Sequence, residues 1–401
     1  MANLKELINE LCPNGVEHEM LRDIADFTNG KGHEKVVEEN GKYILVTSKA
    51  ISSNMEQVRR TNKILTPLNK NDITMVMSDL PNGKALAKCF IIDEDEKYTL
   101  NQRVCGLRVK DLNRVSPKFL YYILNRNIQL LKYDNGVDQT NLKKDDILNI
   151  NIAIPPMEIQ LEIVYILDKF AELSIELSLE LKARQQQFAY YREELYNKND
   201  NIQKLEDIVD IRLGLTHTPK YVDEGIKFIS AQNTSNDYLN LENVKYISQE
   251  EYDSITENAK PKRGDILFTR VGSNLGHPVI VETDEELCMF VSLGYLRVKD
   301  KNKVLNTYIK HWLNTENFWS QVRKNVHGSA KVNLNTGWLS KFEISIPSIE
   351  EQQKVVNILE KLDKLCNNIF EGLPAEIEAR QKQAEYYRDK LLSFKEVEVN
   401  E

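Results

Sequence analysis

Cysteine is scarce in this chain of 401 residues, and no two of its five cysteines form a Cys-x-x-Cys pair. Their odd number and wide spacing exclude a disulfide framework and a zinc ribbon. The six histidines include no pair at the i, i+4 spacing of a zinc-binding helix. We therefore expect a chain without bound metal that works in a reducing compartment, the cytoplasm.

Long hydrophobic runs are also absent. No segment approaches the roughly 18 uninterrupted apolar residues of a transmembrane helix, and residues 1–11 lack the apolar core of a signal peptide. The composition, 41% hydrophobic and 28% charged, is typical of a globular protein rather than a disordered one. At roughly 150 residues per domain, the length predicts two to three domains with no membrane contact.

Positive charge is not in excess, since the net charge is −8. An acidic mean argues against a nucleic-acid partner. Most of the negative charge, however, lies in residues 156–199 and 350–401, and the remainder of the chain is close to neutral. Local basic loops can therefore still meet phosphate groups.

Catalytic motifs are missing as well. The chain has no Gly-x-x-x-x-Gly-Lys-Ser/Thr loop for a nucleotide and no Asn-Pro-Pro-Tyr or Asp-Pro-Pro-Tyr motif of an adenine methyltransferase. No cysteine has a sequence-local base that would mark it as a nucleophile. We expect a non-catalytic chain, which disfavours a self-sufficient nuclease or methyltransferase.

What the sequence does contain is an internal repeat. Four segments recur in the same order at an offset that grows from 184 to 196 residues: 21–24 with 205–208, 107–111 with 296–300, 154–160 with 346–352, and 183–192 with 379–388. A period this long is not that of a solenoid. It indicates two domains of one plan, each followed by the same appendage.

The appendage is a long helix in each copy. Apolar residues at alternating spacings of three and four predict helices over 156–199 and 347–395, and Gly372 with Pro374 should kink the second. The predicted seam consists of Ile163, Ile166, Phe170, Leu173, Leu177 and Tyr191 in the first helix, and of Val355, Ile358, Leu362, Leu365, Ile369 and Tyr387 in the second. The connectivity favours an antiparallel coiled coil. The alternative is that each helix is buried against its own globular domain.

The resulting fold is of the α+β class. We expect two strand-rich domains in pseudo-two-fold tandem, separated by the antiparallel helix pair. Their predicted bounds are 1–155 for the first domain with an N-terminal helix, 156–199 for the first long helix, 200–346 for the second domain, 347–395 for the second long helix and 396–401 for a tail. A shorter helix is expected at 117–131 and again at 307–322.

Two pairs of loops differ between the copies although the helices repeat closely. Amide side chains suit adenine edges and Arg or Lys suits guanine, so polar loop residues are candidates for reading bases. The candidates are Asn82, Lys84, Gln139, Thr140 and Asn141 in the first domain, and Arg270, Ser273, Asn274, His277, Ser329, Lys331 and Asn333 in the second. The alternative is that these are ordinary exposed turns.

The whole plan resembles the specificity (S) subunit of type I restriction–modification systems. The likeness rests on the two-fold repeat, the Ile-Pro…Glu-x-Gln entry to each long helix, and the 373–391 tail with its Tyr-Tyr-Arg-Asp-Lys-Leu ending. The first copy departs from that tail at 174–178, where it lacks the Gly-Leu-Pro turn.

The resemblance implies a division of labour. Each globular domain would be a target-recognition domain that reads one half of a bipartite, asymmetric site in double-stranded DNA, and the helices would set the spacer. Two methyltransferase (M) subunits that bind S-adenosylmethionine would dock on this chain and methylate adenine N6. Restriction (R) subunits would add ATP- and magnesium-dependent cleavage, and no cofactor is expected in this chain. The rival hypothesis is a coiled-coil adaptor that joins two protein-binding domains without DNA contact.

Overall fold

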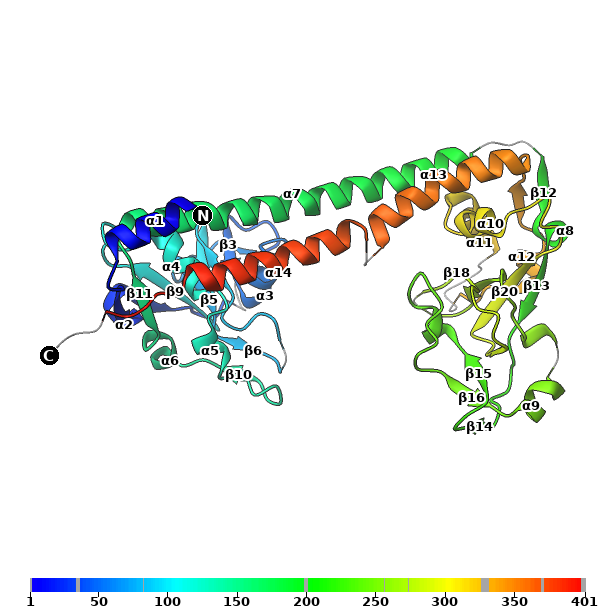
Figure 1. Cartoon of the computed structure of the whole chain (residues 1–401), viewed down its shortest axis with the longest axis horizontal. Helices are drawn as coiled ribbons and strands as arrows, with labels where there is room; N and C mark the ends of the chain where they lie inside the picture. The colour runs from blue at the N-terminus through cyan, green and yellow to red at the C-terminus, as the bar shows by residue number, and fades with distance from the viewer. Residues whose placement is uncertain are drawn as a thin grey trace. The chain divides into compact units, whose positions relative to one another are not determined.

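The structure, a computed structural model, describes residues 2–33, 37–81, 83–197, 201–255, 257–272, 274–325, 332–368 and 371–397. The chain divides into two compact units (Figure 1). The first unit comprises Met1–Glu176 with Ile377–Glu401, and the second comprises Leu177–Glu376. The second unit is therefore an insertion within the sequence of the first.

The first unit mixes short helices with small sheets. Its strands are β1 (Glu17–Met20), β2 (Ala25–Asn29), β3 (Tyr43–Val46), β4 (Arg59–Thr61), β5 (Ile73–Val76), β6 (Ser78–Asp79), β7 (Cys89–Ile91), β8 (Tyr98–Leu100), β9 (Val104–Val109), β10 (Thr140–Asn141) and β11 (Asn151–Ile154). Its shorter helices are α1 (Ala2–Leu11), α2 (Leu21–Ile24), α3 (Ser48–Ser52), α4 (Pro117–Leu124), α5 (Ile128–Leu131) and α6 (Lys144–Leu148). The sheets have the orders β2-β9-β5-β7, β4-β3-β8, β1-β11 and β10-β6.

The second unit repeats this arrangement. Its strands are β12 (Ile202–Lys204), β13 (Val209–Leu213), β14 (Tyr221–Val222), β15 (Ile226–Ile229), β16 (Lys245–Ile247), β17 (Ile266–Thr269), β18 (Pro278–Ile280), β19 (Leu287–Met289), β20 (Leu293–Val298) and β21 (Glu343–Ser345). Its shorter helices are α8 (Leu205–Ile208), η2 (Ala231–Thr234), α9 (Gln249–Ser254), η3 (Glu257–Ala259), α10 (Asn306–Trp312), α11 (Glu316–Asn325) and α12 (Thr336–Leu339).

Sheet topology confirms the internal repeat. The order β13-β20-β17-β18 reproduces β2-β9-β5-β7, and β12-β21 reproduces β1-β11. In the smaller sheets β3 runs parallel to β8, as β15 does to β19. The two repeated segments of the sequence therefore have the same strand order, and each contains an equivalent parallel strand pair.

The identical segments 107–111 and 296–300 form equivalent ion pairs in the two units. Arg108 donates two hydrogen bonds of 2.7 Å to the Asp72 carboxylate, and Arg297 donates bonds of 2.8 and 2.7 Å to Asp265. The aspartate side chains are only 5% and 3% exposed. A carboxylate this buried needs a paired cation, and the planar guanidinium fits it with two bonds.

A buried glutamine explains the second repeated motif. Gln160, fully buried, donates to the carbonyls of Arg114 (2.9 Å) and Pro155 (2.8 Å) and accepts from the Ser116 N–H (2.9 Å). Gln352 makes the same three bonds, at 2.8 to 3.0 Å, with Lys303, Pro347 and Leu305. Each amide ties the start of a long helix to the loop that follows β9 in the first unit or β20 in the second.

The long helices are α7 (Met157–Tyr196), α13 (Ile349–Asn367) and α14 (Leu373–Leu391). In the first unit α7 lies beside α14, where the rings of Phe170 and Tyr387 stack with centroids 5.5 Å apart. In the second unit α7 lies beside α13, and Phe188 and Tyr196 share a core with Val355 (Figure 1). Within each unit the helices run antiparallel, as predicted.

The predicted break in the second long helix is confirmed between α13 and α14. A Cβ at Gly372 would lie 2.6 Å from the carbonyl oxygen of Lys364, so only glycine lets the chain pass there. Pro374 follows in the first turn of α14, where its missing N–H costs nothing.

The seam itself differs in part from its prediction. Ile358 and Leu365 are 44% and 37% exposed, and Tyr191 is 40% exposed, so these three lie outside the buried face. The buried residues of α13 are Gln352, Val355, Val356, Leu359 and Cys366. The face is centred one residue away because Gln352 and Val356 turn toward the globular part of the unit. Ile369 lies outside the described residues.

The apolar face of α7 is buried in both of the ways considered from the sequence, each along a different part of the helix. The first turns of α7 bury Ile159 and Ile163 in one cluster with Phe119 of α4 and Leu4 of α1. Beyond these turns α7 lies beside the other long helices, and its last turns also pack on the globular part of the second unit, where the ring centroids of Tyr196 and Tyr308 are 4.6 Å apart. The helix therefore begins on its own globular domain and continues as a paired helix.

The shorter helices predicted at 117–131 and 307–322 are each two helices instead. Arg126 has a left-handed φ of 59°, and the Asn127 side chain caps α5 by accepting from the N–H of Gln129. In the second unit the Thr315 hydroxyl accepts from the N–H of Phe318 and starts α11. Capping side chains end one helix and start the next at these points.

Candidate nucleic-acid interface

The divergent loops lie side by side in each unit. In the first, β6 pairs with β10, and the Leu142 N–H donates to the Met77 carbonyl at 2.7 Å. In the second, the Leu334 N–H donates to the Arg270 carbonyl at 3.1 Å. The predicted loop pairs thus form one surface in each unit.

In the first unit these loops are organised by a carboxylate. Asp79 accepts hydrogen bonds from the backbone N–H groups of Leu80, Ala85 and Leu86. The exposed Gln139 donates to the Ser78 hydroxyl at 2.8 Å.

Of the other candidates in these loops, Lys84 and Asn141 are exposed, whereas Thr140 is buried. Asn82 lies outside the described residues.

In the second unit the loops are held by a cation. Arg270, 9% exposed, donates from Nε to the Leu334 carbonyl (3.1 Å) and from Nη1 to the Val291 carbonyl (3.0 Å). Burial lowers the pKa of Arg270 from its ordinary value. Two of its donors are already bonded to the backbone, so its main role is to fix these loops.

Among the remaining candidates of the second unit, Asn274 and His277 are bonded to the segment after β15. Asn274 donates to the Thr234 carbonyl at 3.5 Å, and Nε2 of His277 lies 3.0 Å from the Asn236 carbonyl. Asn333 is exposed. Ser273, Ser329 and Lys331 lie outside the described residues.

A basic cleft of the first unit was missed by sequence reasoning. It has a volume of about 550 Å³ and is lined by Thr47, Ser48, Lys49, Gln57, Val58, Arg59, Asn101, Gln102 and Arg103. None of these lining residues is acidic. Within the described residues, no hydrogen bond or ion pair engages the side chains of Lys49, Arg59 and Arg103, all three of which are exposed.

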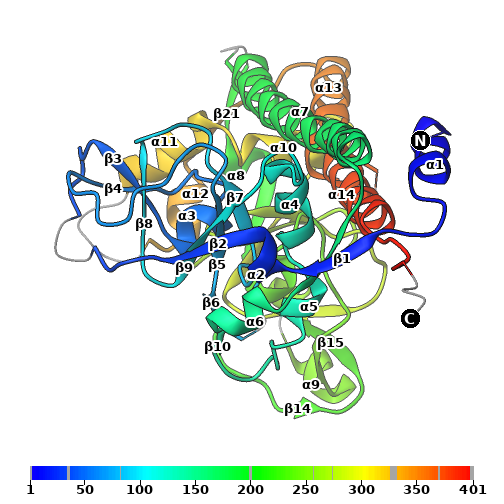
Figure 2. The same ribbon diagram turned by 90° about the vertical axis from the view of Figure 1, so that its left-hand side faces the viewer.

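Strand pairing builds this cleft from three distant segments. Val46 pairs with Leu100 in the parallel pair β3–β8, so residues 47–49 and 101–103 leave neighbouring strands at the same edge. Arg59 of β4 pairs with Leu45 on the other side of β3 (Figure 2). Arg103 adopts a left-handed φ of 66°, and its carbonyl accepts from the N–H of Met77, next to the loop surface.

One further atom of the cleft is without a partner. The buried Oδ1 of Asn101 makes no hydrogen bond to any described residue. A buried amide oxygen without a donor is costly, which is typical of sites that a ligand or water completes.

The equivalent place in the second unit is built from different residues. There the Ala231 N–H donates to the Ser292 hydroxyl at 3.1 Å, so the two segments are bonded to each other. By strand register, Lys245 stands where Arg59 does, and its ammonium lies 4.2 Å from the Tyr221 ring centroid. Gln232 and Ser292 replace the other two cations.

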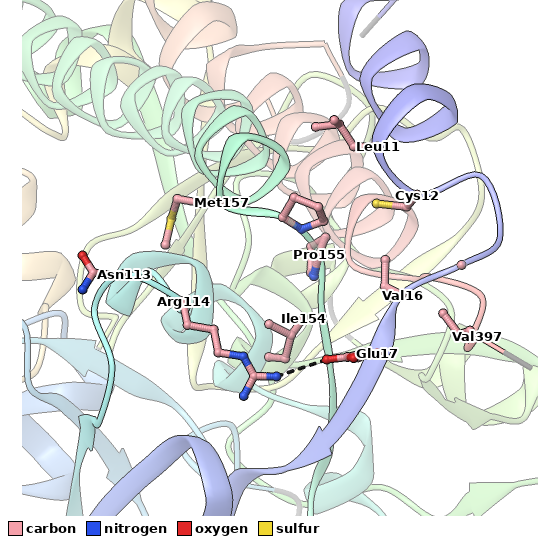
Figure 3. Close-up of a pocket in the computed structure, with 12 residues that line it drawn as sticks. Leu11, Cys12, Val16, Glu17, Asn113, Arg114, Ile154, Pro155, Met157 and Val397 are labelled. Carbon is pink, nitrogen blue, oxygen red and sulfur yellow. Dashed lines mark hydrogen bonds and ion pairs between the residues drawn. The ribbon is translucent and has the colours of Figure 1, made fainter. Parts of the chain in front are cut away.

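A second pocket of the first unit, of about 420 Å³, lies where the chain ends meet (Figure 3). Its cation Arg114 is neutralised by Glu17, at 3.2 Å, and by Glu19. The Val16 N–H donates to the Lys395 carbonyl at 2.9 Å, and α1 lies near the same C-terminal segment (Figure 2). Gly15 has a φ of +105° and passes so close to Lys395 that no side chain fits. This pocket belongs to the closure of the unit.

The described residues contain no group of three or more His, Cys, Asp or Glu side chains placed to hold a metal ion. They also contain no helix whose length and apolarity would let it cross a membrane.

Comparison with known proteins identifies the family. The family model of the type I restriction modification DNA specificity domain matches the chain twice, over residues 13–184 and 197–379. The chain therefore belongs to the family of type I restriction–modification specificity subunits, a non-catalytic class.

Individual relatives agree. A putative type I restriction enzyme specificity subunit of Haemophilus influenzae is 32% identical over 74% of this chain and 77% of its own length. The EcoR124I/EcoR124II specificity subunit of Escherichia coli is 29% identical over 72% and 74%.

Solved structures share the fold. A chain from a structure of the type I R-M system covers 95% of this chain and 98% of its own with a TM-score of 0.66, and an S subunit of M. genitalium covers 94% and 96% with a TM-score of 0.52. Each is 14% identical, so the likeness is one of fold.

Proposed function

We propose that this chain is the DNA sequence-recognition subunit of a type I restriction–modification complex in the cytoplasm. Each unit reads one half of a bipartite, asymmetric site in double-stranded DNA. The chain performs no catalysis itself. S-adenosylmethionine, ATP and magnesium would bind to the methyltransferase and restriction subunits that assemble on it.

The observation that carries this proposal is a shared framework with different loops. The bonds of Gln160 and Gln352 and the Arg108–Asp72 and Arg297–Asp265 pairs are equivalent. The loops that these frameworks hold differ in charge, shape and bonding. A duplicated scaffold with divergent loops suits two readers of two unlike half-sites.

The long helices suit the role of a spacer. A 40-residue helix such as α7 is roughly 60 Å long. Readers that meet successive turns of one duplex face need a spacing near 34–36 Å or a multiple of it. We propose that the helix pair sets the number of unread base pairs between the half-sites.

Two equivalent surfaces suit the docking of two methyltransferase subunits. Tyr190 and Tyr386 occupy the same position of the repeated segment and are each 61% exposed. Each packs edge-on against the next tyrosine, with ring centroids 5.7 and 5.4 Å apart. Exposed aromatic rings are typical anchors of protein interfaces.

Exchanging residues 20–155 for the corresponding segment of another specificity subunit tests the proposal. Methylated adenines are then mapped by sequencing the DNA of cells that express the hybrid complex. One half-site should change and the other stay the same. A change in both half-sites would refute independent reading.

Shortening the helices by one turn tests the spacer. Removing four residues from α7, about 6 Å of helix, should alter the unread spacing while both half-sites persist. An unaltered spacing would exclude the helix pair as a ruler.

The adaptor hypothesis is tested separately. It predicts no salt-dependent binding of random duplex by the purified complex.

A further inference from the structure

The two units are unequal in charge where their loops meet the small parallel strand pair. The first unit presents the three cations of the cleft, whereas the second presents Gln232, Ser292 and a lysine packed on an aromatic ring. Since the frameworks are equivalent, this difference lies in the residues and not in the architecture.

Resting on the proposed function, we propose that the cleft of the first unit binds the phosphate backbone of the duplex, and that the equivalent place in the second unit does not. The phosphate grip would then be divided unequally between two otherwise equivalent readers.

The geometry supports a phosphate ligand. Lys49, Arg59 and Arg103 come from three segments and line one cleft of about 550 Å³. Within the described residues none of the three is neutralised by an acid, unlike Arg114 in the other pocket of the first unit. Exposed cations without partners, gathered around a concave surface, attract polyanions.

The cleft also borders the loops that would read bases. The backbone N–H of Met77 donates to the Arg103 carbonyl at 3.0 Å, and Ser78, the next residue, accepts from Gln139. A strand of DNA held at the cleft would pass next to these loops. Phosphate contacts of this kind position a reader, whereas base contacts specify the sequence.

At the equivalent place, the second unit does not present the three exposed cations that would bind phosphate in the first unit. The bond from Ala231 to Ser292 ties together the two segments that, in the first unit, line the cleft. The guanidinium of Arg270, bonded to the carbonyl of Val291 next to Ser292, is buried and also bonded to the carbonyl of Leu334.

The test measures DNA binding by the full chain co-purified with its methyltransferase subunits, over a salt series, on a duplex that carries the methylated site. The variants are Lys49→Gln, Arg59→Gln, Arg103→Gln and the triple change. The matched controls are Lys245→Gln, at the position equivalent to Arg59, and Lys5→Gln on α1. Circular dichroism confirms that each variant is folded.

Each single change should reduce the slope of log K against log salt by about 1, and the triple change by about 3. Both controls should leave the slope as it is. The set of methylated sequences should not change, because phosphate contacts carry no sequence information.

Three outcomes would overturn the inference. They are a wild-type slope in the triple variant, a loss of slope from Lys245→Gln equal to that from Arg59→Gln, and a changed methylated sequence, which would mean that the cleft reads bases. Failure of the proposed function is distinguishable, since the unmodified complex would then show no sequence-specific binding at all.

A free nucleotide is the other source of phosphate. Titration of the same complex with ATP should give no binding that depends on the three cations. ATP binding that disappears in the triple variant, with DNA binding intact, would contradict the assignment to DNA.

Discussion

The first and second units share a backbone plan and differ in how they stabilise the same surface. In the first unit a carboxylate, Asp79, gathers the loop N–H groups, and the nearby cations stay unpaired. In the second unit a cation, Arg270, is buried against carbonyls. A negatively charged side chain in one unit and a positively charged one in the other therefore both hold the backbone of the equivalent loops. A duplicated domain can change the charge of its outer surface without changing its scaffold.

The largest expected effect concerns the scaffold. Changing Gln160 or Gln352 to Leu leaves one buried N–H and two carbonyls without partners in either unit. At 1–3 kcal/mol for each lost partner, each change should lower the free energy of unfolding of its own unit by about 4 kcal/mol.

Fluorescence separates the two units in this experiment. All three tryptophans, Trp312, Trp319 and Trp338, belong to the second unit. Their emission during urea unfolding should report the Gln352 change, and hydrogen exchange of β9 should report the Gln160 change. If one unit tolerates its change and the other does not, the scaffolds are not equivalent.

The next effect depends on pH and separates the units. His311 in α10 stands where Tyr122 stands in α4, facing Arg192 and Asp363 of the long helices and next to Lys310. Burial, with a smaller effect of Lys310, lowers the pKa of His311 to about 4 from its ordinary value of 6.5.

Because the unfolded chain takes up this proton near pH 6.5 and the folded unit does not, stability is lost as the pH falls from 6.5 to 4. The loss should reach about 3 kcal/mol at pH 4. In His311→Tyr, which copies the first unit, the difference in unfolding free energy between pH 7 and pH 4 should shrink by that amount. An unchanged difference would show that His311 is accessible to protons in the folded unit.

The smallest effect concerns the loops themselves. Asp79→Ala removes the acceptor of three backbone N–H groups at a half-exposed site, at a cost of about 1 kcal/mol confined to the loop. Faster hydrogen exchange at Ala85 and Leu86 would detect it.

Arg270→Met should loosen the corresponding loop of the second unit. Each variant should relax the base preference of one half-site only, and relaxation of both would mean that the loops are read together.

Much of this architecture could be predicted from the sequence. The repeat, the long helices and the break at Gly372 follow from local patterns, since helix periodicity and glycine act over a few residues. The bounds of single elements were less accurate. The helices at 117–131 and 307–322 contain caps, at Asn127 and Thr315, that apolar periodicity does not reveal.

The basic cleft could not be found in this way. Its cations, at positions 49, 59 and 103, are brought together by the pairing of β3 with both β8 and β4, which sequence spacing does not encode. The outward position of Ile358 and Leu365 has a similar origin, because the face that α13 buries depends on Gln352 reaching across to Lys303 and Leu305.

The closure of the first unit by residues 391–397 has a consequence for biosynthesis. Leu391, Leu392 and Phe394 complete the cluster around Ile159 and Leu4, and Lys395 bonds to Val16. A ribosome would thus finish the second unit before it has made the last pieces of the first. The earliest part of the chain must wait the longest to fold, and a premature stop near residue 390 would damage the first unit while leaving the second intact.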